Sequence, residues 1–200
     1  MKEVEFKGFP KIARLSREVV ITEKIDGTNA QIFIDEDLEM HVGSRTRWIT
    51  PKDDNYGFAR WARDNEEDLL KLGQGQHFGE WWGSGIQRGY GLTKGDKRFS
   101  LFNTVRWCLH GGEPKLIPSD DPTVKNYQEL LPKCVGLVPE MYRGEFDSGA
   151  IERQIFRLRV MGSEASPGYL KPEGIVVYHL AGRVGFKKTL DNDEIPKSLY

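Results

Sequence analysis

The chain has 200 residues, of which 29 are basic and 30 acidic, so its formal net charge at neutral pH is −1. This near-balance excludes a highly basic protein that coats nucleic acid. Hydrophobic residues make up 38% and aromatic residues 11% of the chain, which is enough for one core and excludes disorder as the dominant state. With no internal repeat or low-complexity linker, residues 1–200 are expected to form a single domain.

The sequence also indicates where in the cell the protein is located. No run reaches the roughly 18 to 20 apolar residues of a membrane helix, and the N-terminus lacks the apolar core of a signal peptide. Cys108 and Cys134 lie in apolar surroundings without metal-ligand spacing, which favours reduced core thiols over a disulfide or a zinc site. These features predict a soluble cytoplasmic protein.

The first half of the chain is predicted to hold mostly strands, since short stretches rich in β-branched and aromatic residues are bounded by turn residues. These stretches lie at 18–21, 30–34, 38–42, 76–82 and 98–105. Between them, apolar residues recur at helical spacing over 56–72, where Asp54 or Asn55 can cap the start and Gly73 suits the end.

The second half continues this mixture. A short helix is predicted after Pro122, ending before Pro132, and a longer one over 148–161. The predicted strands lie at 135–142, 174–180 and 183–187. Turn residues at 35–37 and 181–182 favour antiparallel hairpins over helical crossovers. The predicted fold class is therefore α+β, an antiparallel sheet with a few inserted helices.

The most informative segment is 23–29, between the first two predicted strands, where Lys24, Asp26 and Gly27 have the spacing Lys-x-Asp-Gly. Alone, it also fits a hairpin turn in which Gly27 is left-handed and Lys24 is solvated.

Four later segments carry further candidate side chains. Each of these side chains also has an interpretation without a catalytic role. Arg45 could lie in a solvated loop, Glu80 on the solvent-exposed face of a strand, and Glu173 at the end of a loop. Lys187 and Lys188 could be exposed charges on an edge strand. The four segments lie at 43–46, 78–83, 172–177 and 184–188. A fifth segment, 98–103, holds two phenylalanines on a predicted strand.

Taken in order, these segments resemble the motifs of the covalent nucleotidyltransferases, the superfamily of polynucleotide ligases and capping enzymes. The resemblance runs from Lys24 to Lys188, nearly the whole chain, and independent coincidence of so many ordered matches is implausible. A stretch from Gly83 to Gln87 is similar to a Gly-Ile-Gln sequence of phage-type RNA ligases, which favours a ligase over a capping enzyme.

The resemblance implies that Lys24 attacks the α-phosphate of a nucleoside triphosphate and holds the nucleotide as a phosphoramidate. An amine attacks only when it is deprotonated, and burial or nearby cations favour that form. Asp26 would orient the lysine, Glu173 would help place a divalent metal, and Lys187 and Lys188 would contact the phosphate. Many relatives have two lysines two residues apart, and here Gly185 takes the first of these positions.

The resemblance also implies the nucleotide contacts. Glu80 would accept hydrogen bonds from the ribose hydroxyls, and Arg45 would bind near the ribose and phosphates, where a planar donor suits phosphate. Because strand alternation puts Phe99 and Phe102 on opposite faces, one of them stacks on the purine. We favour Phe99 for stacking and Phe102 for the core. The other nucleotide-binding candidates are Glu23, Gly27 and Asn29; a similar asparagine follows the first motif in phage-type RNA ligases.

One further departure from the motifs lies at position 103, and one further stretch is a candidate RNA contact. Relatives often carry Asp at the position of Asn103, so a metal role there is doubtful. The stretch 88–98 holds four basic residues and one acidic residue, a local charge of 4 − 1 = +3. With Tyr90 available to stack on an unpaired base, this stretch is the candidate RNA contact. A glycine-rich loop with ordinary solubilising charge is the alternative.

The predicted function is that of an ATP-dependent RNA ligase that requires Mg²⁺ or Mn²⁺ and joins a 5′-phosphate to a 3′-hydroxyl through a lysyl-AMP intermediate. Its partners would be nucleic acid ends, with a possible accessory protein. The alternatives are a DNA nick-sealing ligase, a GTP-using capping guanylyltransferase and a non-catalytic module that binds nucleotide or nucleic acid ends. Only 200 − 188 = 12 residues follow Lys188, so no appended oligonucleotide-binding domain is expected.

Overall fold

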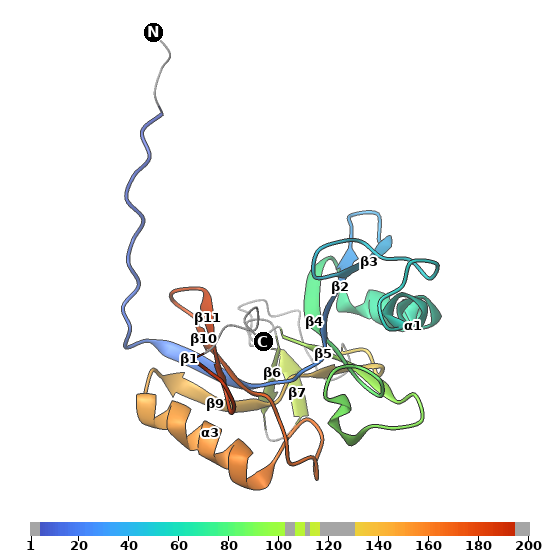
Figure 1. Cartoon of the computed structure of the whole chain (residues 1–200). Helices are drawn as coiled ribbons and strands as arrows, with labels where there is room; N and C mark the ends of the chain where they lie inside the picture. Colours follow the sequence, from blue (N-terminus) through green and yellow to red (C-terminus); the bar gives the residue numbers. More distant parts are fainter. Residues whose placement is uncertain (1–4, 103–106, 111–112, 117–130, 195–200) are drawn as a thin grey trace.

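The computed structural model describes residues 5–102, 107–110, 113–116 and 131–194, with the backbone alone for 107–110 and 113–116. Two β-sheets form the body of the protein (Figure 1). Sheet A has four antiparallel strands in the order β11-β10-β1-β9. Its strands are β1 (Glu18–Lys24), β9 (Glu140–Glu145), β10 (Gly174–His179) and β11 (Val184–Thr189).

Sheet B has five strands in the order β3-β2-β4-β5-β8, antiparallel except for the parallel pair β5 and β8. Its strands are β2 (Thr28–Ile34), β3 (Met40–Ser44), β4 (Gly75–Gly83), β5 (Lys97–Leu101) and β8 (Val135–Leu137). A separate antiparallel pair is formed by β6 (Trp107–His110) and β7 (Glu113–Leu116).

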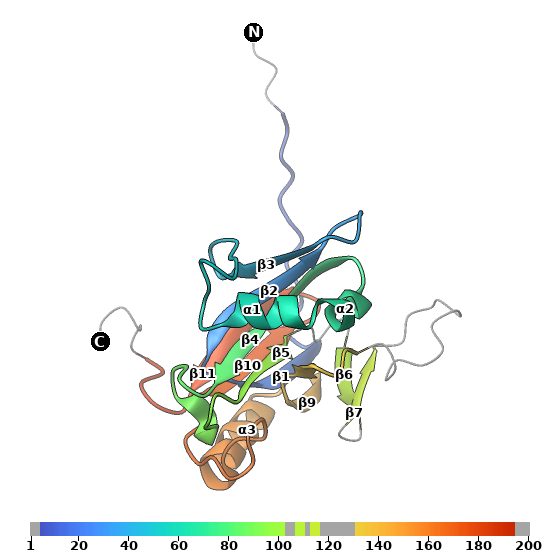
Figure 2. The same ribbon diagram turned by 90° about the vertical axis from the view of Figure 1, so that its right-hand side faces the viewer.

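Each sheet buries one face under helices, and alternation along the strands explains which face (Figure 2). On sheet A, Val19, Ile21, Ile175 and Val177 form a core with residues of α3 (Ser148–Met161). On sheet B, the core side chains include Ala30, Ile32, Trp81, Phe99 and Leu101, packed against α1 (Phe58–Asp64). The opposite faces of the two sheets remain available to line a site between them.

The helices largely follow the prediction. α3 has the predicted bounds, because Asp147 caps the N–H groups of Gly149 and Ala150, and Gly162 ends it at φ 82°. The predicted helix over 56–72 is divided into α1, α2 (Glu66–Leu69) and η1 (Leu70–Leu72). The break falls at Asn65, whose amide donates to the Trp61 carbonyl at 2.7 Å and so competes with the helical backbone.

Most predicted strands are present, with two exceptions. The predicted strand 98–105 is present as β5 only as far as Leu101, and 103–105 lie outside the described residues. The hairpins at 35–37 and 181–182 are present as the antiparallel pairs β2–β3 and β10–β11. The predicted strand 135–142 is wrong as one element, because β8 pairs within sheet B and β9 within sheet A. Pro139 lies at the break, where a residue without an N–H cannot continue a ladder. The helix predicted after Pro122 lies mostly outside the described residues.

Residues 5–14 are extended and carry the exposed side chains of Phe6, Phe9 and Ile12. Within the part of the chain that the structure describes, no helix is both long and apolar enough to cross a membrane.

Candidate active site

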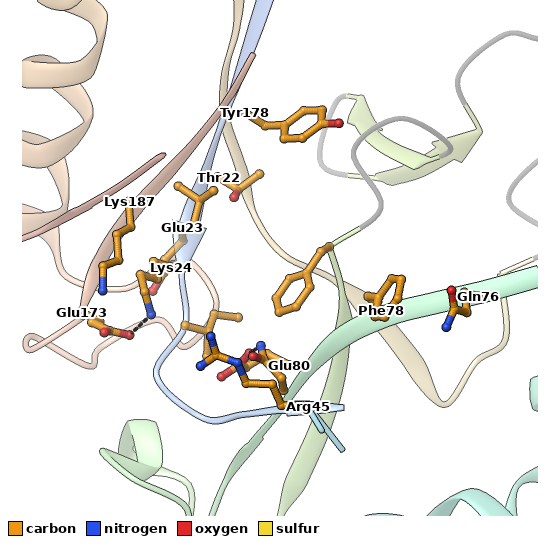
Figure 3. Close-up of a pocket in the computed structure, with 14 residues that line it drawn as sticks. Thr22, Glu23, Lys24, Arg45, Gln76, Phe78, Glu80, Glu173, Tyr178 and Lys187 are labelled. Atoms are coloured by element: carbon orange, nitrogen blue, oxygen red, sulfur yellow. Dashed lines mark hydrogen bonds and ion pairs between the residues drawn. The ribbon is translucent and has the colours of Figure 1, made fainter. Parts of the chain in front are cut away.

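A pocket of about 630 Å³ lies between the two sheets and receives side chains from both (Figure 3). Lys24, Glu173 and Lys187 lie toward one end, which we call the charged end. Phe78 lies toward the other end, and Glu80 and Arg45 lie between them. The lining residues are Thr22, Glu23, Lys24, Ile25, Asn29, Arg45, Gln76, Phe78, Glu80, Phe102, Glu173, Val176, Tyr178 and Lys187. Segments far apart in the sequence thus supply one concave polar and aromatic site.

The charged end is centred on Lys24, the last residue of β1. Its Nζ lies 2.5 Å from Oε2 of Glu173, the residue just before β10. The antiparallel register pairs Lys24 with Gly174, which explains why two residues 149 positions apart meet. The side chain of Glu173 is 2% exposed and that of Lys24 is 23% exposed. A buried carboxylate therefore holds a lysine that still reaches the pocket.

The segment 25–27 crosses from sheet A to sheet B, because β1 and β2 lie in different sheets. It is not the predicted alternative of a hairpin turn with a left-handed glycine. Gly27 lacks a positive φ, and a Cβ there would lie 2.4 Å from the carbonyl oxygen of Trp81. Glycine is required at this position because two backbones approach closely.

Glu80 of β4 lines the pocket next to the charged end, on the side of sheet B. Its Oε1 accepts from the N–H of Gly27 at 2.9 Å, and its Oε2 accepts from Nδ2 of Asn29 at 3.0 Å. Burial raises the pKa of Glu80 to about 7, while the Gly27 N–H and the charge of Lys24 act in the opposite direction. The carboxyl group is thus fixed, nearly buried and only partly ionised near neutral pH.

Strand alternation in β11 separates the two predicted phosphate-binding lysines. Lys187 pairs with Val176, which lines the pocket, whereas Lys188 pairs with Ile175 of the core under α3. Lys187 accordingly lines the pocket, and Nζ of Lys188 lies 3.8 Å from carboxylates of Glu152 and Asp193. Lys188 does not line the pocket, so its predicted phosphate contact does not fit this geometry.

The same alternation corrects the prediction for the aromatic residues. Phe99 is fully buried and packs against Phe58 and Trp61, with ring centroids 5.0 and 5.8 Å apart. Phe102 and Phe78 line the pocket, and Phe102 is 37% exposed. Phe99 therefore lies in the core and Phe102 at the pocket, the opposite of the surroundings predicted for them. Asn103 lies outside the described residues.

Two acidic residues of the first motif have hydrogen-bond partners that do not line the pocket. The carboxylate of Glu23 accepts from Ser163 Oγ at 2.7 Å and from the N–H groups of Glu164 and Ala165. Burial raises its pKa. Asp26 pairs with Arg88 at 3.1 Å and does not line the pocket. Both carboxylates therefore fix neighbouring segments.

The candidate RNA contact at 88–98 is corrected in one respect. Tyr90, in η2 (Gly89–Gly91), is fully buried, so its ring is unable to stack on a base. Within this stretch, Arg88 is engaged with Asp26, and Lys97 donates to the carbonyl of Tyr56 at 2.7 Å. Sequence reasoning missed the role of Tyr90 as an internal contact because the surrounding glycines indicated only an exposed loop.

Comparison with known proteins identifies the family. A family model described as RNA ligase matches residues 17–192, which include every residue that lines the pocket. The chain belongs to the RNA ligase family. No curated protein matches this RNA ligase family member.

The structure is also similar to solved structures of an RNA ligase from Naegleria gruberi. One mutant of that ligase, with ATP and Mn, has a TM-score of 0.59 and 21% identity over 88% of this chain and 51% of that chain. Another, with AMP and Mn, has a TM-score of 0.57 and 22% identity over 86% and 49%. At this identity the likeness shows the shared fold. The chain spans about half the length of these RNA ligases.

Proposed function

We propose that this RNA ligase family member is an ATP-dependent RNA ligase that uses Lys24 as its nucleophile. The observation that carries the proposal is the pocket, in which the Lys24 amine, the Glu173 and Glu80 carboxylates and the Lys187 side chain converge from both sheets. The Naegleria structures contain ATP or AMP with manganese, which supports ATP as the nucleotide here.

The proposed first step is nucleotidyl transfer to Lys24. Nζ of Lys24, once deprotonated, forms a bond to the α-phosphorus of ATP, the bond from that phosphorus to the oxygen bridging to the β-phosphate breaks, and pyrophosphate leaves. Lys187 and Arg45 would balance the phosphate charge. Glu80 and Asn29 would bind the ribose, and Phe102 and Phe78 would flank the base.

The residues present also fit a divalent cation. Mg²⁺ and Mn²⁺ prefer oxygen ligands, and the buried carboxylate of Glu173 lines the charged end of the pocket. Such an ion would neutralise phosphate charge when bound. Lys24 contacts Oε2 of Glu173, so the amine and the ion would share this carboxylate.

The later steps are proposed from the family. AMP would pass from Lys24 to a 5′-phosphate end, and a 3′-hydroxyl would then displace AMP and form the phosphodiester. Residues 17–192 match the RNA ligase family, which supports RNA ends as the substrate.

The test is to incubate the protein with α-labelled ATP and Mn²⁺ and to look for label bound covalently to the denatured chain. We expect an acid-labile adduct in the wild type and none in Lys24→Ala, while Lys188→Ala retains it. Peptide mass spectrometry should locate AMP on Lys24.

Parallel reactions with GTP and with matched DNA and RNA nicks distinguish the alternative functions. Label trapped only from GTP would identify a capping-type enzyme, and faster sealing of a DNA nick than of a matched RNA nick would identify a DNA ligase. Absence of an adduct with any triphosphate would leave a non-catalytic binding module. An adduct that survives Lys24→Ala would refute the proposed nucleophile.

A further inference from the structure

The hydroxyl of Tyr90 contacts the backbone of both segments that meet at the charged end of the pocket. It donates to the carbonyl of Lys24 at 3.3 Å and accepts from the N–H groups of Asp26 at 3.0 Å and Glu173 at 3.3 Å. A phenolic hydroxyl has one proton and two lone pairs. These bonds therefore use its whole hydrogen-bonding capacity.

The position of this hydroxyl is itself fixed. The Tyr90 ring is fully buried, with its centroid 5.4 Å from that of Trp82 and 4.7 Å from that of Tyr169. Ser166 Oγ donates to the Tyr90 carbonyl at 2.8 Å. Burial also raises the pKa of Tyr90, so the hydroxyl keeps the proton that it donates.

Tyr90 adopts a backbone conformation that disfavours a bulky side chain. Its φ is 49° and its ψ 32°, in the left-handed region. Such strain persists where the surrounding structure imposes it, and it gathers at functional sites. The packing of the Tyr90 ring and the hydrogen bonds of its hydroxyl therefore hold its backbone in a strained conformation.

Arg88, in the same loop, makes a second connection between these segments. Its Nε donates to Oδ2 of Asp26 at 3.1 Å, and its Nη1 donates to the carbonyls of Lys171 at 3.1 Å and Pro172 at 3.2 Å. Two side chains of one loop thus join the segment after Lys24 to the segment before and at Glu173. Neither Tyr90 nor Arg88 lines the pocket.

We propose that the loop 84–92 is a clamp that sets the distance between the Lys24 amine and Glu173, with Tyr90 as the positioning residue. Lys24 and Glu173 come from opposite ends of the chain, and β1–β10 pairing fixes their backbones only up to the Lys24–Gly174 pair. Beyond that pair, Tyr90 and Arg88 hold the two segments together. The clamp's effect on catalysis rests on the function proposed for Lys24, whereas its effect on the resting position of Lys24 does not.

The first test measures the position of Lys24 without nucleotide. The protein is treated with a small amine-reactive reagent, and the labelling rate of each lysine is read by peptide mass spectrometry. Tyr90→Phe keeps the ring but removes the hydroxyl, and we expect Lys24 to label about two- to tenfold faster as its contact with Glu173 loosens. Arg88→Gln, a milder change at a partly exposed site, should act in the same direction.

The matched control is Tyr169→Phe, which removes the hydroxyl of the ring stacked on Tyr90. That hydroxyl contacts the Arg88 carbonyl at 3.5 Å, and its loss should leave the labelling of Lys24 unchanged. Lys97, on sheet B, should label at the same rate in every variant. Unchanged Lys24 labelling in both Tyr90→Phe and Arg88→Gln would overturn the clamp, as would equal acceleration at Lys24 and Lys97, which indicates general loosening.

The second test is single-turnover formation of the lysyl-AMP adduct. Since the residues placed around ribose and base are untouched, Tyr90→Phe should leave ATP affinity nearly unchanged and slow adduct formation by about tenfold to a hundredfold. A wild-type rate in Tyr90→Phe would contradict the proposal. If the wild type forms no adduct while Lys24 labelling still changes in Tyr90→Phe, the proposed ligase function fails and the clamp stands.

Discussion

Glu80 shows how a residue suited to ligand binding destabilises the ligand-free protein. Burial raises its pKa from 4.5 to about 7, so the unfolded chain releases this proton at a lower pH than the folded protein does. Between these two values folding takes up a proton, and stability falls as the pH rises. Above pH 7 the cost levels off at about 3 kcal/mol.

Glu80→Gln should therefore stabilise the ligand-free protein and weaken nucleotide binding. The Gln oxygen can accept from Gly27, and Asn29 can turn its own oxygen toward the new amide. The melting temperature of Glu80→Gln relative to wild type should rise from pH 4.5 to 7 and then stay level. Glu36→Gln, at the exposed β2–β3 turn, is the control for loss of a carboxyl. A constant difference across this range would show that burial of Glu80 does not govern the effect.

The corrected aromatic assignment gives a paired prediction. Phe102→Ala should weaken AMP binding by about 1–3 kcal/mol, the usual contribution of base stacking, and leave the unfolding midpoint nearly unchanged. Phe99→Ala should lower the free energy of unfolding by about 3–5 kcal/mol, since it empties a core position. Calorimetric titration with AMP and urea unfolding measure the two effects. Retention of wild-type AMP affinity by Phe102→Ala would contradict its place in the nucleotide pocket.

The residues that line the pocket were partly predictable from sequence. Lys24, Glu80 and Glu173 stand in ordered motifs and do line one pocket, although their chemical roles remain predictions. Phe99 and Phe102 were interchanged because alternation shows that two residues face opposite ways without showing which way. The missing information was the register. Glu80 pairs with Ser100, so the even-numbered residues of β5 share the face of sheet B that carries Glu80.

At the scale of the element, strand alternation in β11 places two adjacent lysines on opposite faces of sheet A. Lys187→Ala should slow adduct formation by about a hundredfold, as expected for loss of a cation at a developing phosphate charge. Lys188→Ala should stay within about twofold, because its contacts are ion pairs on the α3 side of the sheet. Labelled ATP and Mn²⁺ provide the measurement. Equal loss in both variants would argue against alternation as the cause.

Elements were predictable where local chemistry determines them. α3 has both a capping aspartate and a terminal glycine, and its bounds were predicted correctly. The sequence of 135–142 predicts one strand, yet this segment contributes β8 to sheet B and the beginning of β9 to sheet A. This division depends on partners far away in the sequence, which local patterns do not contain. The β6–β7 pair was likewise missed as a hairpin.

At the scale of the whole molecule, a nucleotide in the pocket would join the two sheets. AMP at about one hundred times its dissociation constant should add about 2.7 kcal/mol of stability. Hydrogen exchange should slow in β10 and β11 of sheet A and also in β2 and β4 of sheet B. Lys188→Ala should show the same protection as wild type. Protection restricted to one sheet would mean that AMP binds outside the pocket between them.

The crossing at 25–27 has a consequence for where the chain tolerates extra residues. A foreign peptide inserted after Asp37 would extend an exposed turn and leave both sheets as they are. A single residue inserted between Lys24 and Thr28 would lengthen the covalent tether between the two sheets and shift the Gly27 N–H away from Glu80. The number of residues in this connection thus sets the spacing between the Lys24 amine and the Glu80 carboxylate across the pocket.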